Sequence, residues 1–183
     1  MSLVTAAGHG GHGEDRLSGT IRPQRPGDQE AIRKVTVAGF SRHPHSDQTE
    51  HLIVERLRHS GTLALSLVAE EDGVVAGHVA FSPVRIGLAS DGWYGLAPLS
   101  VAPARQNRGI GTHLVREGLS RLREAGAAGC VVLGEPAYYG RFGFAPDPAI
   151  TLQGPPAEYF QALPFGPDRP EGETRFGDAF AVD

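Results

Sequence analysis

The sequence has one cysteine, one lysine and no long apolar run. A single cysteine, Cys130, excludes an internal disulfide framework and any metal site built from several cysteines. No stretch approaches the ~20 apolar residues that a membrane span needs. Residues 1–20 also lack the basic and apolar segments of a signal peptide. These absences predict a cytoplasmic protein without a membrane partner.

An excess of positive charge is also missing. The formal net charge is −4, which argues against a nucleic-acid partner. The chain of 183 residues is 40% hydrophobic and 21% charged, as in an ordinary globular protein, and this length favours one domain. The Gly/His-rich stretch 8–13 indicates a disordered leader, so we expect residues 1–19 to be that leader and residues 20–183 to be the domain.

The first half of the chain predicts a short strand, then two helices, then three strands. Asp28 is expected to cap a helix over 29–40, and Ser46 or Asp47 a second helix that runs to His59. Strands are expected over 20–22, 63–69, 74–84 and 93–101, with a hairpin turn at 71–73. The last three of these strands follow one another closely, which predicts an antiparallel meander.

Pro98 lies inside the third strand of that meander. Because proline cannot donate to a strand ladder, we expect a bulge there, and unpaired backbone groups over 99–101 that a ligand could use. The second half predicts a helix over 110–125, a buried strand over 129–133, a short helix over 135–141, and strands near 150–152 and 174–180. The last strand must be paired or covered, either in its own sheet or in a dimer, so we expect a monomer or a homodimer.

A glycine-containing turn precedes the helix that begins near 110. Helix N-termini bind anions because their first N–H groups are unpaired and the helix dipole is positive there. Gly109 and Gly111 let a ligand approach the backbone, and Arg105 and Arg108 add positive charge. The sequence therefore predicts a phosphate or pyrophosphate at the amides of 107–112. A helix start without a ligand is the alternative interpretation.

Two known phosphate motifs do not fit this turn. A P-loop requires a lysine, which is absent here, and a dinucleotide-binding fingerprint requires a third glycine where Leu114 stands. The pattern Gln106-x-x-Gly109-x-Gly111 after 99–101 instead resembles the acetyl-coenzyme A motif of the GCN5-related N-acetyltransferases (GNAT). The segment 139–144, Tyr-Gly-Arg-Phe-Gly-Phe, is similar to a later motif of the same superfamily. The segments 77–84, 133–139 and 175–180 are similar to those of a bacterial subgroup, the YhbS-like predicted acetyltransferases.

The resemblance implies an α/β (α+β) fold. Its central sheet is mixed, mainly antiparallel and splayed between two strands, with helices on both faces. Acetyl-CoA would lie in the splay, and no metal is implied. The residues that would bind the cofactor are Leu99, Ser100, Val101, Gln106, Asn107, Arg108, Gly109, Ile110, Gly111, Thr112 and Phe142.

The resemblance also implies an acetyl transfer from the thioester to a primary amine in a ternary complex. Tyr139 occupies the position of the motif tyrosine and would act as the general acid, unless it only packs on the cofactor. Tyr138 is expected to face the core or the substrate side. His78, Glu135 or water would accept the proton of the amine, with structural roles as the alternatives for His78 and Glu135.

Two functions therefore remain. The first is an acetyl-CoA-dependent N-acetyltransferase that acts on an amine of a small molecule or a protein. The second is a non-catalytic module that binds coenzyme A or acyl-CoA as a sensor or for interaction. The two interpretations share the same pocket and differ in what they require of Tyr139 and of a base.

Overall fold

The computed structural model describes residues 18–44, 46–88 and 91–181. The helices are α1 (Gln29–Phe40), α2 (Glu50–His59), α3 (Ile110–Glu124) and α4 (Pro136–Tyr139). The strands are β1 (Thr20–Pro23), β2 (Leu65–Glu71), β3 (Val74–Ile86), β4 (Trp93–Val101), β5 (Gly129–Leu133), β6 (Ile150–Thr151), β7 (Phe160–Pro164) and β8 (Gly172–Phe176). Short 3-10 turns are η1 (Pro103–Arg105), η2 (Gly140–Phe142), η3 (Ala157–Tyr159) and η4 (Asp178–Phe180).

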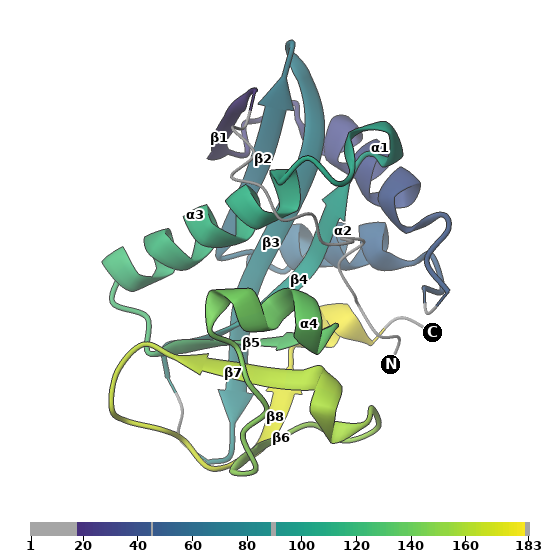
Figure 1. Ribbon diagram of the computed structural model, residues 1–183. Coiled ribbons are helices and arrows are strands. Elements are labelled where there is room, and N and C mark those ends of the chain that lie inside the picture. The colour runs from purple at the N-terminus through teal and green to yellow at the C-terminus, as the bar shows by residue number, and fades with distance from the viewer. Residues whose placement is uncertain (1–17, 45, 89–90, 182–183) are drawn as a thin grey trace.

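The strands form one mostly antiparallel sheet in the order β1-β2-β3-β4-β5-β7 (Figure 1). β4 and β5 pair in parallel. β8 pairs with Val84–Ile86 at the end of β3, and also with β6. The expected meander is therefore present as β2, β3 and β4. The fold confirms the predicted mixed, mainly antiparallel α/β class.

Helices cover both faces of this sheet (Figure 1). α3 packs so closely that a Cβ on Gly118 would lie 2.3 Å from the Phe81 ring. On the opposite face, a Cβ on Gly39 of α1 would lie 3.1 Å from the Val101 carbonyl oxygen. Between α3 and the sheet lies the main core, which includes Leu67, Val79, Phe81, Leu99, Leu114 and Val115. Burial of these apolar side chains is what holds α3 in place.

The sheet opens between β4 and β5, as the sequence predicted. The two strands pair only at Trp93–Gly95 with Gly129–Val131, so among the described residues no strand pairs with β4 on that side from Leu96 onward. The register between β3 and β4 also shifts at Pro98, with one residue of β3 opposite two of β4. The expected bulge is therefore present, and the Ala97–Pro98 peptide bond is cis.

Several predicted boundaries were wrong. α2 begins at Glu50, with Thr49 and not Ser46 or Asp47 at the N-cap position. The predicted strand over 174–180 is two elements, because the chain leaves β8 after Phe176 and turns into η4.

The sequence analysis missed β7, which flanks β5 and prevents it from being an edge. Asp28 stands at the N-cap of α1 but makes no capping bond; its carboxylate instead accepts from Arg22 and from the Arg25 N–H.

The predicted leader lies outside the described residues except for Ser18 and Gly19. Ser18 is already held, because its hydroxyl donates to Glu71 at 2.6 Å. Over the described ranges, no helix has both the length and the apolar character that a membrane crossing requires. The same part of the chain contains no cluster of three or more His, Cys, Asp or Glu side chains able to hold a metal ion.

Candidate active site

The turn before α3 leaves its amides free for an anion. Gly109 precedes the helix with a φ of 78°, a left-handed conformation that favours glycine, and no side chain caps the helix. His113 makes the first hydrogen bond of the helix, from its N–H to the Gly109 carbonyl at 3.0 Å. The N–H groups of Ile110, Gly111 and Thr112 therefore have no partner within the helix.

The two arginines of the turn differ in their surroundings. Arg108 is exposed, and within the described residues it has no hydrogen bond or ion pair. Arg105 instead donates to Glu71, the last residue of β2, at 2.5 Å. The positive charge that Arg105 adds to the turn is therefore already paired with the Glu71 carboxylate.

Glu71 ties the turn to the β2–β3 hairpin. Its carboxylate is buried and accepts from the Ser18 hydroxyl as well as from Arg105. These two hydrogen bonds, in that order, lower the pKa of Glu71 below its ordinary value. The carboxylate therefore stays charged at neutral pH and holds Arg105, and with it η1, beside the turn.

The β4 side of the site is formed largely by backbone. The side chains of Leu99, Ser100 and Val101 are buried, and the Ser100 hydroxyl lies 3.4 Å from that of Thr36 on the α1 side. Gln106 turns back and donates from Nε2 to the Val101 carbonyl at 3.1 Å. Main-chain groups of this strand are thus what a ligand in the opening would meet.

In the predicted phosphate loop, residues 107–112, some side chains are likewise buried and leave only their backbone accessible, whereas others are exposed. The Ile110 side chain is in the core, so only its backbone can contact a ligand. Asn107 is exposed, with a φ of 62°, and Thr112 is partly exposed at the start of α3. Among residues 107–112, Asn107, Arg108 and Thr112 are therefore the side chains that are exposed or partly exposed.

Tyr139 lies on α4, directly after the end of β5. It is 1% exposed, and a Cβ on Gly134 would lie 2.3 Å from its ring. The ring meets Phe144 edge-on with centroids 5.9 Å apart, and Phe142 at 6.3 Å. The two predicted motif residues, Tyr139 and Phe142, are therefore brought together beside the opening of the sheet.

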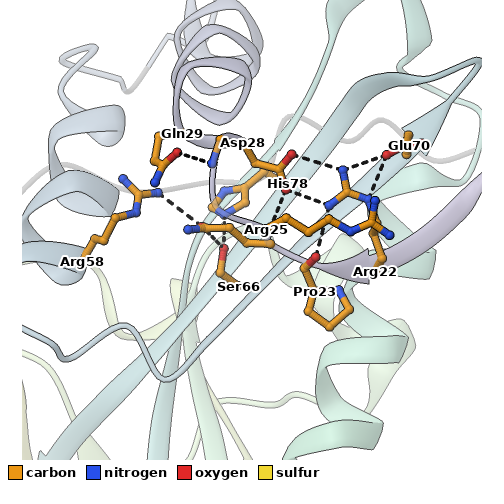
Figure 2. A network of polar contacts seen from close by, with 11 residues as sticks. Arg22, Pro23, Arg25, Asp28, Gln29, Arg58, Ser66, Glu70 and His78 are labelled. Carbon is orange, nitrogen blue, oxygen red and sulfur yellow. Dashed lines mark hydrogen bonds and ion pairs between the residues drawn. The ribbon is translucent and has the colours of Figure 1, made fainter.

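His78 is fully buried. Its neighbour Gly77 faces Ile110 and Leu114 of α3, so the His78 side chain lies on the opposite face of the sheet, near Ser66 (Figure 2). Ser66 donates its hydroxyl hydrogen to Gln24 at 2.7 Å, so its oxygen accepts from His78 Nε2 at 2.8 Å. This assigns the imidazole proton to Nε2. Burial, with a smaller contribution from Arg58, lowers the pKa of His78 to about 3. The imidazole is therefore neutral at physiological pH.

Glu135 is placed differently. It is exposed at the N-cap position of α4, where its carbonyl accepts from the N–H groups of Tyr138 and Tyr139 at 3.0 Å. Its carboxylate makes no capping hydrogen bond. Of the two side chains predicted as bases, Glu135 is open to solvent at the tyrosine segment, whereas His78 is enclosed in the core.

Comparison of the sequence and the fold with known proteins identifies the family. Residues 30–144 match the model of the acetyltransferase (GNAT) family. The chain belongs to the GNAT family. The resemblance seen in the sequence is therefore confirmed, and so is an N-acetyltransferase as the class of enzyme.

Individual GNAT relatives are similar over most of the chain. The uncharacterized N-acetyltransferase YhbS of Escherichia coli is 45% identical over 125 residues, which cover 68% of this chain and 72% of YhbS. A GNAT acetyltransferase from Brucella melitensis, solved with acetyl-CoA, has a TM-score of 0.80 and 53% identity and covers 90% of this chain and 99% of its own. YhbS itself, solved with CoA, has a TM-score of 0.83 and 34% identity in that superposition, with 94% and 97% covered.

Two contacts beside the turn were not predicted from the sequence. Glu71 carried only the signal of a hairpin turn, since nothing local indicates that it will meet Arg105. Tyr138 packs in the core, as expected, and its hydroxyl also reaches Gly111 in the first turn of α3. Both contacts join segments that are distant in sequence, and only the folded chain brings them together.

Proposed function

We propose that this protein transfers the acetyl group of acetyl-CoA to a primary amine, of a small molecule or a protein, in a ternary complex. One observation carries the proposal: β4 and β5 pair only over Trp93–Gly95 and Gly129–Val131, and the uncapped turn of α3 follows the unpaired end of β4 while Tyr139 follows β5. A pyrophosphate at the turn and a thioester near the tyrosine are two groups that acetyl-CoA would present. The likeness to relatives solved with acetyl-CoA or CoA supports the same ligand.

The residues present fit this cofactor. The unpaired amides of Ile110, Gly111 and Thr112, together with the Arg108 guanidinium, would hold the pyrophosphate. The backbone of Leu99–Val101, on the side that β5 leaves, would pair with the pantetheine amides. Phe142 and Tyr139 would pack against the thioester end. When bound, acetyl-CoA supplies the activated acyl group.

The chain's own groups would then position the amine and move protons. The amine nitrogen forms a bond to the acyl carbon as the carbon–sulfur bond breaks, and Tyr139 donates its hydroxyl proton to the departing sulfur. A backbone N–H of β4 near Leu99 would stabilise the charge that develops on the acyl oxygen. Holding both reactants side by side supplies most of the remaining rate.

The base in this proposal is Glu135, acting through water. An amine with a pKa of ~10.4 must lose a proton before it attacks. A neutral imidazole with a pKa of about 3 is a poor acceptor for that proton, which speaks against His78. Glu135 is exposed at the end of α4 that adjoins the tyrosines, and its carboxylate has no capping role.

An amine library tests the proposed function. Purified protein is incubated with acetyl-CoA and single amines, namely polyamines, aminoglycosides, amino acids and peptides, and the release of free thiol is followed. We expect at least one amine to accelerate thiol release and acetyl-CoA to raise the Tm, because it binds the native state. Binding without transfer to any amine would favour the sensor function instead. We further propose that the enzyme acts in the cytoplasm.

A further inference from the structure

Gln161 is a buried amide in an otherwise apolar strand. It lies in β7, whose other residues are Phe, Ala, Leu and Pro, and it is 1% exposed. A buried amide costs free energy unless it is hydrogen-bonded. Its Nε2 donates to the carbonyl oxygen of Gly134 at 3.1 Å. The partner of this buried amide is therefore the residue that directly follows β5.

Gly134 is held by β7 and the residue before it through both of its backbone groups. Its N–H donates to the Tyr159 carbonyl at 2.8 Å, and its own carbonyl accepts from Gln161. The Tyr139 ring packs directly on Gly134, since a Cβ there would lie 2.3 Å from a ring carbon. A movement of Gly134 would therefore move the surface on which the tyrosine ring lies.

The segment from Gly134 to Ala145, which carries Tyr139, depends on such anchors. Its helix, α4, is four residues long, and helices this short have little stability of their own. At the far end of the segment, Ala145 and Ala162 exchange two backbone hydrogen bonds, of 3.1 and 2.8 Å. Both ends of the segment are thus fixed at β7. Of these anchoring hydrogen bonds, that of Gln161 comes from a side chain, so a single substitution can remove it.

We propose that Gln161 is a positioning residue for Tyr139. By holding the Gly134 carbonyl, it fixes the end of β5 and, with it, the place of the Tyr139 ring. This assignment rests on the proposed function, in which Tyr139 gives its proton to the departing sulfur. A general acid must lie within hydrogen-bond reach of the atom that it protonates. A displaced ring would therefore slow the proton transfer while the rest of the cofactor site stays intact.

Steady-state kinetics of Gln161→Met test this role. Methionine has nearly the length of glutamine but no N–H donor, so the Gly134 carbonyl loses its partner. With the amine found in the library, kcat should fall by about tenfold, which is part of the ~100-fold that a general acid supplies. KM for acetyl-CoA should hardly change. Leu163→Met is the matched control, because it places the same side chain on the same face of β7 without removing a hydrogen bond, and it should keep the kcat of wild type.

The double variant Gln161→Met/Tyr139→Phe separates positioning from a general disturbance of the fold. If Gln161 acts through the Tyr139 hydroxyl, its replacement should lower kcat no further once that hydroxyl is gone. A disturbed fold would instead lower kcat about tenfold in both backgrounds. Equal effects in the two backgrounds, or a Gln161→Met enzyme with the kcat of wild type, would overturn the proposal.

Gln161→Glu tests the same hydrogen bond if the methionine variant does not fold. A protonated carboxyl can donate to the Gly134 carbonyl, whereas a carboxylate can only accept, and burial favours the protonated form. The kcat of this variant divided by that of wild type should therefore increase as the pH decreases from 8.5 to 6.0. A ratio that does not depend on pH would overturn the role of the bond. Failure of the proposed function is recognised separately, because wild type would then acetylate no amine, or Tyr139→Phe would keep full turnover, and the role of Gln161 would fall with it.

Discussion

At the scale of single residues, burial decides which groups can do acid–base chemistry. His78 and Glu135 were both candidate bases in the sequence, beside water. The fold encloses one in the core and leaves the other at an exposed helix start. Tyr139, in contrast, packs between Gly134 at the end of β5 and the ring of Phe144. We therefore expect Tyr139 to affect turnover and His78 to affect how stability depends on pH.

Tyr139→Phe should reduce kcat by about 100-fold, the scale of losing a general acid. This corresponds to ~2.7 kcal/mol of transition-state stabilisation. KM for acetyl-CoA should hardly change, because the ring remains and the hydroxyl acts mainly in the transition state. Steady-state kinetics with the amine found in the library test this, with Tyr94→Phe as the control. Undiminished turnover would leave positioning as the main source of rate.

His78 should make stability depend on pH. Its pKa is about 3 in the folded chain and near its ordinary 6.5 when unfolded. Below pH 6.5 the unfolded chain therefore binds a proton that the folded chain rejects, and stability falls as the pH decreases toward 3, by up to ~1.4 kcal/mol per pH unit. Urea unfolding at pH 7.5, 6.0 and 5.0 measures this. His78→Gln keeps a donor for Ser66 without a titrating group, so its curve should be flatter than that of wild type. Parallel curves would contradict the prediction.

At the scale of elements, the turn before α3 is held by contacts with residues that are distant in the sequence. η1 is tied to the end of β2 through Glu71 and Arg105, and Gln106 is tied to the end of β4. The N-terminus of α3 is in turn fixed because the helix lies so close to the sheet at Gly118. Three connections thus hold a turn whose own residues are mostly small or exposed.

Glu71→Gln should weaken CoA binding by about tenfold without changing kcat. The substitution keeps the size of the side chain but removes the charge that holds Arg105, and such charged hydrogen bonds contribute about 1.5–3 kcal/mol. Asp72→Asn is the matched control, because Asp72 lies 3.8 Å from the same guanidinium but its side chain is 90% exposed. An equal effect of both variants would mean that general charge, and not this contact, holds the turn.

At the scale of the whole molecule, the C-terminal segment pairs with the central sheet and packs on α2. β8 pairs with Val84–Ile86 of β3, and the Phe176 ring lies against Gly95 of β4. η4 then packs on α2, with Ala179 beside Ile53 and Leu57. The sequence predicted that this end would complete its own sheet or support a dimer, and the first of these is what the fold shows.

A chain that ends at Pro170 should be destabilised and should self-associate. Without β8, the β3 edge and the apolar surface around Val84 and Trp93 are exposed. Light scattering would report association, and a red shift in the emission of Trp93, which is 2% exposed in the intact chain, would report opening. A chain that ends at Ala181 is the control. A stable, monomeric protein after removal of β8 would show that this strand is dispensable.

The sequence by itself determined the features that depend on local pattern. Alternating and helical periodicity predicted the meander, α1 and α3, and Pro98 predicted the bulge. The tertiary structure decided what depends on distant partners: the pairing of β7 with β5, the neutralisation of Arg105 by Glu71, the burial of His78, and the contact of Tyr138 with the turn. The physical reason is that backbone conformation follows from neighbours in the chain, whereas burial, charge pairing and side-chain contact follow from neighbours in space.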